Sequence, residues 1–440
     1  MSNAFRARPG GALSGRVRVP GDKSISHRSI MLGAIADGTS HVTGFLEGAD
    51  AISTMNVFRA LGVRIEGPSR GRVTVHGVGV DGLAGTDSAL DCGNAGTAMR
   101  LLMGLLAGQR FASTLVGDES LSRRPMRRVA DPLARMGARI DTNDGRPPVR
   151  IHASQGLTGI DYDMPVASAQ VKSAILLAGL YANGRTSVTE PAPTRDHTER
   201  MLAGFGVPVL REGARVSVEG GRRLRATDID VPADISSAAF FMVAASIAPG
   251  SDDVLEHVGV NPTRTGILDI LRLMGANLEL VNPREVGGEP VADLRVRAAP
   301  LRGIAVPPEL VPLAIDEFPV LFVAAACAQG RTVVTGAEEL RVKESDRIAV
   351  MADGFAALGV AAQPTPDGMV IEGRGGEAAP FGGGTIESHG DHRIAMAFSV
   401  AALRARGEVL IRDTVNVATS FPGFPALARG AGMRVEETDA

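Results

Sequence analysis

The 440-residue sequence has little cysteine, little excess charge of either sign and no long apolar run. Its two cysteines, Cys92 and Cys327, provide neither a disulfide framework nor a metal-ligand spacing. We therefore expect two small buried side chains in a reducing compartment, which favours a cytoplasmic protein. The formal net charge of −3 excludes a general attraction to nucleic acid, so any basic site must be local.

A membrane-spanning segment is not expected either. The longest uncharged run, Ile235–Ser251, contains Ser, Pro and Gly and is too short to cross a bilayer. The first residues, MSNAFRARPGGALSG, lack an apolar core, so we expect neither a signal peptide nor an anchor there.

Lysine is scarce. Of the 46 basic residues only three are lysines, namely Lys23, Lys172 and Lys343. A lysine ammonium is compact and its pKa can shift, whereas an arginine stays charged. In so arginine-rich a chain these lysines are candidates for a chemical role; the alternative is that they remain by chance. All three fall in or beside predicted helix starts: two at apolar helices, and Lys343 at the start of the helix KESDRIAVM.

A repeat divides the chain, whose length already predicts more than one domain. Six segments read as an amphipathic helix, a glycine and then an apolar strand. Glycine at such a helix end predicts a left-handed cap. The six glycines are Gly62, Gly137, Gly206, Gly275, Gly359 and Gly432.

A second pattern alternates with the first: an Ala/Leu/Met-rich helix followed by a β-branched strand, again six times. These helices are apolar nearly all round, so we expect them in domain centres. Extra strands such as RVTVHGV and LRVRAAP lie between. The pattern predicts an α/β protein of six helix–strand–helix–strand units in two three-unit lobes, with the midpoint near residue 233.

The polar residues gather where the apolar helices begin. These starts read GDKSISHR, CGNAGTAMR, ASAQVKSA, ADISSAAF, IDEFPV and GDHRIAM. Helix N-termini offer unpaired N–H groups and a partial positive charge, so several of them facing one cleft would bind an anion. The same segments carry arginines that can add bidentate contacts: Arg28, Arg100, Arg124, Arg347 and Arg393.

Two metal or nucleotide motifs are weak. PGDKS is a poor Walker A loop, because it lacks the first glycine and has Asp between Gly and Lys. ESHGDH contains possible zinc ligands, but their spacing matches no common pattern. These ligands are Glu387, His389, Asp391 and His392. We expect no metal and no organic cofactor.

Several motifs leave two interpretations open. Asp316 is either the N-cap of an apolar helix or a general base. Glu344 is either an acid in the first turn of a helix or a proton carrier. LSRRPMRR is either a solvated basic face or a phosphate clamp, and CGNAGTAMR is either a helix cap or a close backbone approach to a ligand.

Taken together, the segments closely resemble the 3-phosphoshikimate 1-carboxyvinyltransferases, also called 5-enolpyruvylshikimate-3-phosphate synthases. Nine stretches match in order over residues from about 12 to 425, which is far more specific than any one motif. They are PGDKSISHR, GNAGTAMR, RRPM, VASAQVKSA, TRDHTE, NPTRTG, DEFPVL, LRVKESDR and GDHRIAMA.

The resemblance implies an inside-out α/β barrel pair built from six βαβαββ-type units. We expect one lobe over residues 21–233 and the other over 234–440, with residues 1–20 packed on the second lobe. The family transfers the enolpyruvyl group of phosphoenolpyruvate to the 5-hydroxyl of shikimate 3-phosphate and releases phosphate. It needs no metal or cofactor, and its lobes close on the substrates. We expect a monomer with these two substrates as its only partners.

Site residues follow from the resemblance, position by position. The catalytic residues are Asp316, Glu344 and Lys23. The residues for shikimate 3-phosphate are Lys23, Ser24, Arg28, Ser168, Ala169, Gln170, Arg195, Asp316 and Lys343. The residues for phosphoenolpyruvate are Lys23, Asn94, Gly96, Arg124, Gln170, Arg347 and Arg393, with Thr97 in the same turn as Asn94.

The sequence departs from many family members at two places. Ala169 stands where many have Ser, and ATSFPGF has Thr419 and Ser420 but no Lys where many have one. Both features resemble the second class of the family, which often tolerates glyphosate. Gly96, which several members of that class replace by Ala, is the opposite feature. The response to glyphosate therefore stays open.

Two other functions fit the same fold. A sister reaction uses UDP-N-acetylglucosamine as acceptor and is expected to need a Cys near GDESLSRRPM, where this chain has none. A catalytically silent scaffold is the other alternative, and the intact acids and cationic clamps argue against it.

Overall fold

The structure is a computed structural model that describes residues 4–439. The chain divides into two compact units, with junctions between Pro20 and Gly21 and between Val231 and Pro232. We call residues 21–231, with the hairpin tip 286–288, the N-terminal unit, and the remaining described residues the C-terminal unit. The sequence placed its midpoint two residues later, at 233. No helix within residues 4–439 is long and apolar enough to cross a membrane.

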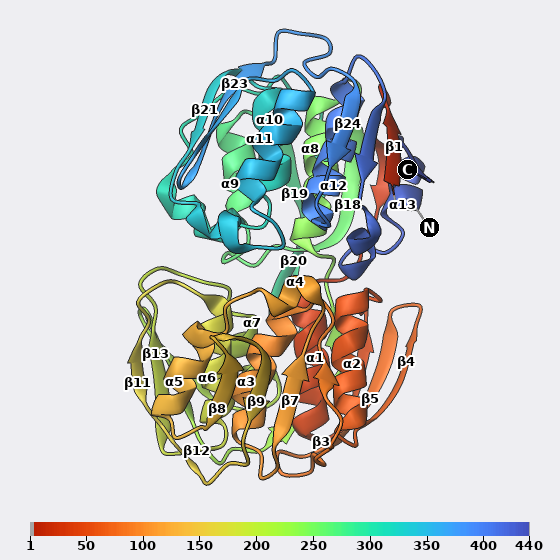
Figure 1. Cartoon of the computed structure of the whole chain (residues 1–440). Helices are drawn as coiled ribbons and strands as arrows, with labels where there is room; N and C mark the ends of the chain where they lie inside the picture. The colour runs from red at the N-terminus through yellow and green to blue at the C-terminus, as the bar shows by residue number, and fades with distance from the viewer. Residues whose placement is uncertain (1–3, 440) are drawn as a thin grey trace. The chain divides into compact units, whose positions relative to one another are not determined.

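Both units contain several helices of different lengths (Figure 1). In the N-terminal unit they are α1 (Lys23–Ile35), α2 (Ala49–Ala60), α3 (Gly96–Ala107), α4 (Glu119–Ser122), α5 (Arg127–Arg135), α6 (Ala169–Gly179) and α7 (His197–Gly204). In the C-terminal unit they are α8 (Ile235–Ile247), α9 (Gly266–Leu273), α10 (Phe318–Ala326), α11 (Arg347–Ala357), α12 (His392–Ala401) and α13 (Phe424–Ala431).

The sheets of the N-terminal unit share one strand order. The first contains β16 (Leu224–Arg225), β17 (Ile229–Asp230), β3 (Ala36–Thr43), β5 (Arg72–Val78) and β4 (Arg64–Ser69). The second contains β6 (Leu90–Asp91), β7 (Ser113–Val116), β9 (Arg146–Ile151) and β8 (Ile140–Asn143). The third contains β11 (Asp161–Asp163), β13 (Arg185–Thr189), β15 (Arg215–Glu219) and β14 (Val209–Glu212), beside the pair β10 (Leu157–Thr158) and β12 (Ala182–Asn183).

The C-terminal unit repeats this arrangement. Its sheets are β2 (Ser14–Val17), β18 (Asp252–Gly259), β20 (Glu289–Arg297) and β19 (Asn277–Val286); β21 (Gln329–Val334), β23 (Gly368–Arg374) and β22 (Ala362–Thr365); and β24 (Gly384–Glu387), β25 (Val409–Arg412), β1 (Ala4–Arg8) and β26 (Arg434–Thr438). The strand after each apolar helix pairs antiparallel with an inner strand, whose other edge takes the strand that follows the glycine cap.

The first strand of the chain completes the last sheet. β1 pairs antiparallel with β25 and with β26, so residues near both termini share one sheet (Figure 1). β2 pairs parallel with β18 in another sheet of the same unit. Residues 4–17 therefore belong by hydrogen bonding to the second half of the chain.

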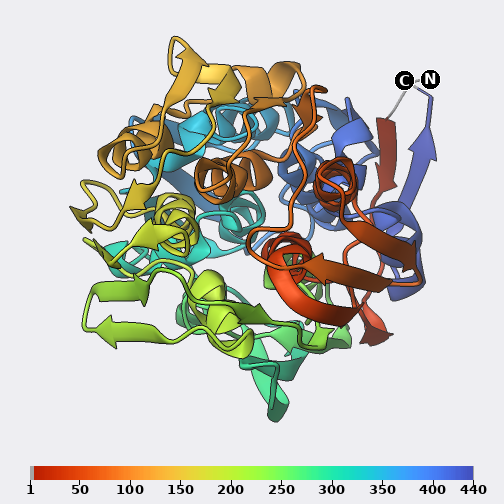
Figure 2. The same cartoon turned by 90° about the horizontal axis from the view of Figure 1, so that it is seen from below.

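The apolar helices lie inside each unit and the sheets lie outside (Figures 1 and 2). Every residue of α8 and of α10 is buried, and these two helices pack against each other and against α12. In the N-terminal unit α3 packs against α6 in the same way. An amphipathic helix would leave a polar stripe in such a position, so the all-round apolar sequence explains this inside-out arrangement, which confirms the prediction.

All six predicted glycine caps adopt the left-handed conformation. Their φ angles lie between 74° for Gly359 and 112° for Gly432. A strand follows each of them, as predicted. Other residues reach this region only at a cost, so these positions mark the six repeats in the sequence.

Candidate active site

Lys23 is the first residue of α1 and its ammonium forms an ion pair with Asp50 of α2. The Lys23 side chain is one-fifth exposed, whereas Asp50 is buried. Asp22 caps the helix by accepting a hydrogen bond from the Ile25 N–H at 2.9 Å. The lysine is thus directed by a fixed carboxylate at a helix N-terminus, next to the half-buried Ser24.

Arg28 lies one turn further along α1, and its side chain is buried rather than exposed to solvent. Its Nε donates to the Thr198 hydroxyl at 2.7 Å, and its Nη2 donates to the Ser173 hydroxyl at 3.0 Å. Its Nη1 donates to the Ser24 carbonyl at 2.9 Å. Arg28 therefore joins α1 to α6 and α7, and it fixes the backbone of Ser24.

Two neighbouring arginines of LSRRPMRR have opposite environments. Arg123 is exposed, whereas Arg124 is buried and its Nη2 donates to the Asn94 side-chain oxygen at 2.7 Å. The Asn94 amide in turn donates to Asp118 at 2.7 Å. The loop therefore holds Arg124 beside the turn that begins α3, so it is not simply a solvated basic face.

Gly96 begins α3 directly under this arginine. A Cβ atom at Gly96 would lie 3.0 Å from Nη1 of Arg124 and 3.3 Å from Nη1 of Arg100. The glycine thus allows two guanidinium groups to approach the backbone closely. The two interpretations of this turn, a helix cap and a close backbone approach to a ligand, both stay predictions.

Arg100 joins three site segments, although the list of site residues predicted from the sequence omitted it. Its Nη1 donates to the Gln170 side-chain oxygen at 2.6 Å, and its Nη2 donates to the Pro125 carbonyl at 3.2 Å. The Gln170 amide donates to the Thr97 hydroxyl at 2.8 Å. The signal for Arg100 was its position one helical turn after Gly96 on the same helix.

The remaining predicted residues of the N-terminal unit lie on the segments around α6 and α7. Ser168 caps α6, on which Ala169 is the first residue and Gln170 the second. Arg195 is partly exposed on the loop between β13 and α7, two residues before α7 begins.

In the C-terminal unit a buried arginine organises the predicted acids. Arg347 is 1% exposed and its Nε lies 2.8 Å from the Asp391 carboxylate. Its Nη2 lies 2.7 Å from Glu344, and its Nη1 lies 3.5 Å from Asp316. Three carboxylates therefore surround one guanidinium group.

The pKa values of Asp391 and Arg347 shift in the directions that keep this pair charged. Burial by itself would raise the pKa of Asp391, but the adjoining Arg347 outweighs burial and lowers it. Burial would lower the pKa of Arg347, but Asp391 and Glu344 outweigh it and raise it. Asp391 also accepts from the Ser345 hydroxyl at 3.0 Å and from the Arg393 N–H at 2.9 Å. Asp391 thus links the starts of α11 and α12.

Lys343 lies within reach of two carboxylates. Its Nζ is 3.7 Å from Asp316 and 2.9 Å from Glu339. The side chains of Lys343, Asp316 and Glu344 are each between 15% and 20% exposed, so all three are reachable from solvent.

Three helix-start interpretations from the sequence are wrong. Helix α11 begins at Arg347 with Asp346 as its cap, so Lys343 does not open it and Glu344 is not in its first turn. Helix α10 begins at Phe318 with Glu317 at the cap position, so Asp316 does not cap it. Residues 315–317 form a turn and residues 343–345 a bend, and Asp346 caps α11 by accepting from the Ala349 N–H at 3.0 Å.

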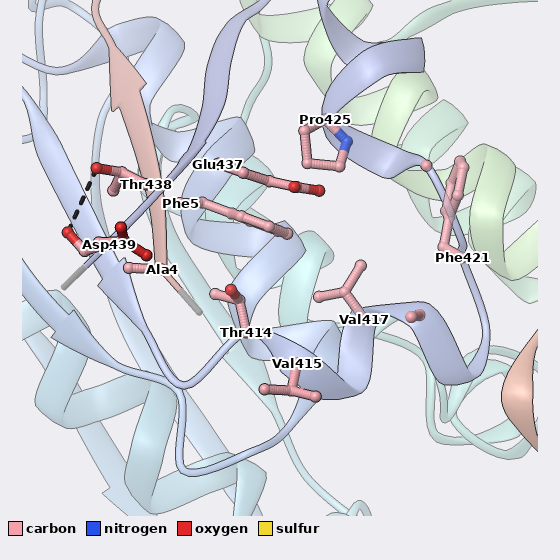
Figure 3. Close-up of a pocket in the computed structure, with 12 residues that line it drawn as sticks. Ala4, Phe5, Thr414, Val415, Val417, Phe421, Pro425, Glu437, Thr438 and Asp439 are labelled. Atoms are coloured by element: carbon pink, nitrogen blue, oxygen red, sulfur yellow. Dashed lines mark hydrogen bonds between the residues drawn. The ribbon is translucent and has the colours of Figure 1, made fainter. Parts of the chain in front are cut away.

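The segment ATSFPGF, where many family members have a lysine, is internally satisfied. Thr419 and Ser420 are both 8% exposed, and the Thr419 hydroxyl donates to the Asn416 carbonyl at 2.6 Å. The neighbouring side chains Ala418 and Phe421 line a cavity of about 540 Å³ between β1, β26 and the turn 415–419 (Figure 3). None of the predicted site residues lines this cavity.

The zinc interpretation has no geometric support. Within residues 4–439 no group of three His, Cys, Asp or Glu side chains is placed to hold a metal ion. Both cysteines are buried free thiols, and burial raises the pKa of Cys327 to about 12. One of the possible zinc ligands, Asp391, forms an ion pair with Arg347.

Known proteins resemble this chain over its whole length. A family model described as EPSP synthase (3-phosphoshikimate 1-carboxyvinyltransferase) matches residues 7–427. A 3-phosphoshikimate 1-carboxyvinyltransferase of Alkalilimnicola ehrlichii is 68% identical over 99% of this chain and 97% of its own length. A solved EPSP synthase from Acinetobacter baumannii has a TM-score of 0.90 at 59% identity, covering 99% of this chain and 100% of that one.

A more distant structure shows the fold alone. The enolpyruvyl transferase NikO from Streptomyces tendae has a TM-score of 0.77 at 17% identity, covering 100% of this chain and 99% of that one. The inside-out arrangement is therefore retained at low sequence identity.

Proposed function

The chain belongs to the EPSP synthase family, and from that premise we propose that it transfers the enolpyruvyl group of phosphoenolpyruvate to the 5-hydroxyl of shikimate 3-phosphate and releases phosphate. The observation that carries the proposal is the cluster of Asp316, Lys343 and Glu344 around Arg347, in a chain that matches this family from end to end. Such a cluster offers two partly exposed acids and a lysine for proton transfer.

Most of the binding groups in this proposal belong to the N-terminal unit. Lys23, Ser24, Ser168, Gln170 and Arg195 take the acceptor sugar phosphate, with Ala169 and Lys343 beside it. Asn94, Gly96 and Arg124 take phosphoenolpyruvate, with Arg347 and Arg393. Helix N-termini and guanidinium groups suit both substrates because each carries several negative charges. Arg28 acts mainly by fixing Ser24, to whose carbonyl it donates.

The reaction proceeds by addition and elimination. Asp316 accepts the proton of the 5-hydroxyl while that oxygen bonds to C2 of phosphoenolpyruvate, and Glu344 gives a proton to C3. The resulting tetrahedral intermediate carries both the sugar oxygen and phosphate on C2. Elimination returns the C3 proton to Glu344, breaks the bond between C2 and the phosphate oxygen, and lets phosphate leave with the proton held by Asp316. Lys343 and Arg347 keep Asp316 in place.

We further propose that the enzyme works as a cytoplasmic monomer without cofactor, and that it is closest to the second class of its family. The buried thiols support a reducing compartment. Ala169 and the lysine-free ATSFPGF segment support the class.

A phosphate-release assay tests the proposal. We expect phosphate from phosphoenolpyruvate only when shikimate 3-phosphate is added, with no loss of rate in chelator. Release with UDP-N-acetylglucosamine would instead favour the sister reaction, and release with neither acceptor would favour a silent scaffold.

A further inference from the structure

Lys172, the third lysine, is completely buried inside the N-terminal unit. Its ammonium forms an ion pair with Glu190 and lies 2.6 Å from Oε1 of Glu199. All three side chains are at most 8% exposed. A charged group is costly to bury even in a pair, so an apolar side chain would be the simpler choice for this position. The contacts of Glu190 and Glu199 show which segments the cluster holds in place.

Glu190, one of the two acids of the cluster, holds the loop of residues 190–194 together. The Glu190 carboxylate accepts from the N–H and from the hydroxyl of Thr194, both at 3.1 Å. Lys172 donates to the Thr194 carbonyl at 3.5 Å. Residues 190–194 are thus folded back on one carboxylate, and the next residue in the chain is Arg195.

The other acid of the cluster fixes the helix that follows Arg195. Glu199 lies in the first turn of α7, so the ion pair with Lys172 ties α7 to α6. The neighbouring Thr198 donates to Ser173 of α6 at 2.7 Å. Lys172 therefore contacts the segment on both sides of Arg195, once at Glu190 and once at Glu199.

We propose that Lys172 is a positioning residue that presents Arg195 to the phosphate of the acceptor substrate. The inference rests on the proposed function, which assigns Arg195 to that phosphate. An arginine on an unrestrained loop loses side-chain and loop freedom on binding, whereas a loop that is already ordered avoids this cost. The cluster acts before binding, by ordering residues 190–199.

Lys172→Met tests the inference, because methionine has a similar length and no charge. Loss of a buried ion-pair partner is strongly destabilising, so residues 190–199 should become less ordered. We therefore expect the KM for shikimate 3-phosphate to rise at least about tenfold, while the KM for phosphoenolpyruvate changes less than about twofold. Amide hydrogen exchange in residues 190–199 should rise at least about tenfold, with α3 unchanged. The Thr194 amide is the most informative one to follow, because its N–H donates a hydrogen bond to the Glu190 carboxylate.

A triple variant separates positioning from stability. Lys172→Met with Glu190→Gln and Glu199→Gln leaves no charge from this cluster in the interior, so it should fold even if the single variant does not. We expect its thermal stability to recover while its exchange and its KM for the acceptor stay high. If that KM returns to the wild-type value together with stability, Lys172 serves stability alone and the inference is overturned.

The remaining outcomes separate this inference from the proposed function. Unchanged exchange in residues 190–199 of an active Lys172→Met enzyme would overturn the inference alone. Raised exchange with an unchanged KM for the acceptor would also overturn it. A wild-type protein that releases no phosphate with shikimate 3-phosphate would overturn the proposed function, on which the positioning role depends.

Discussion

Three arginines of the candidate site, Arg124 and Arg100 in the N-terminal unit and Arg347 in the C-terminal unit, contact different groups. In the N-terminal unit Arg124 and Arg100 donate to the side-chain oxygens of Asn94 and Gln170 and to the Pro125 carbonyl, all of them neutral acceptors. In the C-terminal unit Arg347 faces three carboxylates within 3.5 Å. A neutral acceptor orients a guanidinium group, whereas a carboxylate also compensates part of its charge.

We interpret this difference in terms of the proposed reaction. Most of the proposed binding residues belong to the N-terminal unit, whereas the proposed proton-transfer acids, Asp316 and Glu344, belong to the C-terminal unit. The following predictions test this division of the reaction.

Asp316→Ala should have the largest effect. Loss of a general base lowers kcat by about 10²–10⁴-fold, and the structure gives Asp316 no capping role whose loss would unfold α10. Phosphate release measures kcat, and calorimetric titration should show that both substrates still bind. A variant that loses binding as strongly as turnover would assign Asp316 to the binding task and break the division.

Lys23→Arg should have the next largest effect, although the charge is kept. Lys23 is directed by buried Asp50, and a planar guanidinium would pair with that carboxylate in a different geometry from a compact ammonium. We expect kcat/KM for both substrates to fall by about 10²-fold, the size typical for loss of one preorganised donor. Steady-state kinetics check this, and a variant within about twofold of wild type would show that position 23 needs only a charge.

Gly96→Ala should produce a smaller change, confined to the N-terminal unit. The added methyl group would press on Arg124 at 3.0 Å and on Arg100 at 3.3 Å, so both guanidinium groups must shift. We expect the KM for phosphoenolpyruvate to rise about tenfold or less, one such displaced hydrogen bond being worth about 1 kcal/mol. The glyphosate inhibition constant should rise at least as much, because glyphosate is the longer ligand. An unchanged inhibition constant beside a higher KM would separate Gly96 from the inhibitor.

Asp253→Asn should have the smallest effect and only on stability. Burial, with a smaller contribution from Asp252, raises the pKa of Asp253 to about 6, in contrast to Asp391 beside Arg347. A folded-state pKa above the unfolded value means that folding favours the protonated acid, so the carboxyl destabilises the fold as pH rises from about 4 to 6. The variant should gain about 1–3 kcal/mol in unfolding free energy at pH 8 and nothing at pH 4. Equal gains at both pH values would contradict the titration.

The repeats could be predicted from the sequence because they depend on local signals. Gly62 and its five counterparts mark left-handed caps, and the helices they end are periodic. The apolar helices have no polar face, and this predicts their burial, as in α8. These features need only neighbouring residues, so an isolated sequence contains them.

The site geometry could be predicted only in part. Asp316 and Glu344 were candidates from their positions in the sequence, but the pattern placed Lys343 at the start of a helix that begins four residues later. Asp391 and Arg347 are 44 residues apart, and Lys172 meets Glu199 across two helices. Such pairs depend on how the helices of one unit pack, which no local pattern encodes.

Deuterium incorporation from D₂O into the methylene carbon during turnover tests the division most directly. Glu344→Gln and Arg124→Gln should be compared at saturating substrates by rapid quench and mass spectrometry. We predict that Glu344→Gln lowers incorporation at least about 100-fold, whereas Arg124→Gln stays within a few-fold of wild type once phosphoenolpyruvate is saturating. Loss of incorporation in Arg124→Gln with full incorporation in Glu344→Gln would contradict the assignment of phosphoenolpyruvate binding to Arg124 and of proton transfer to Glu344.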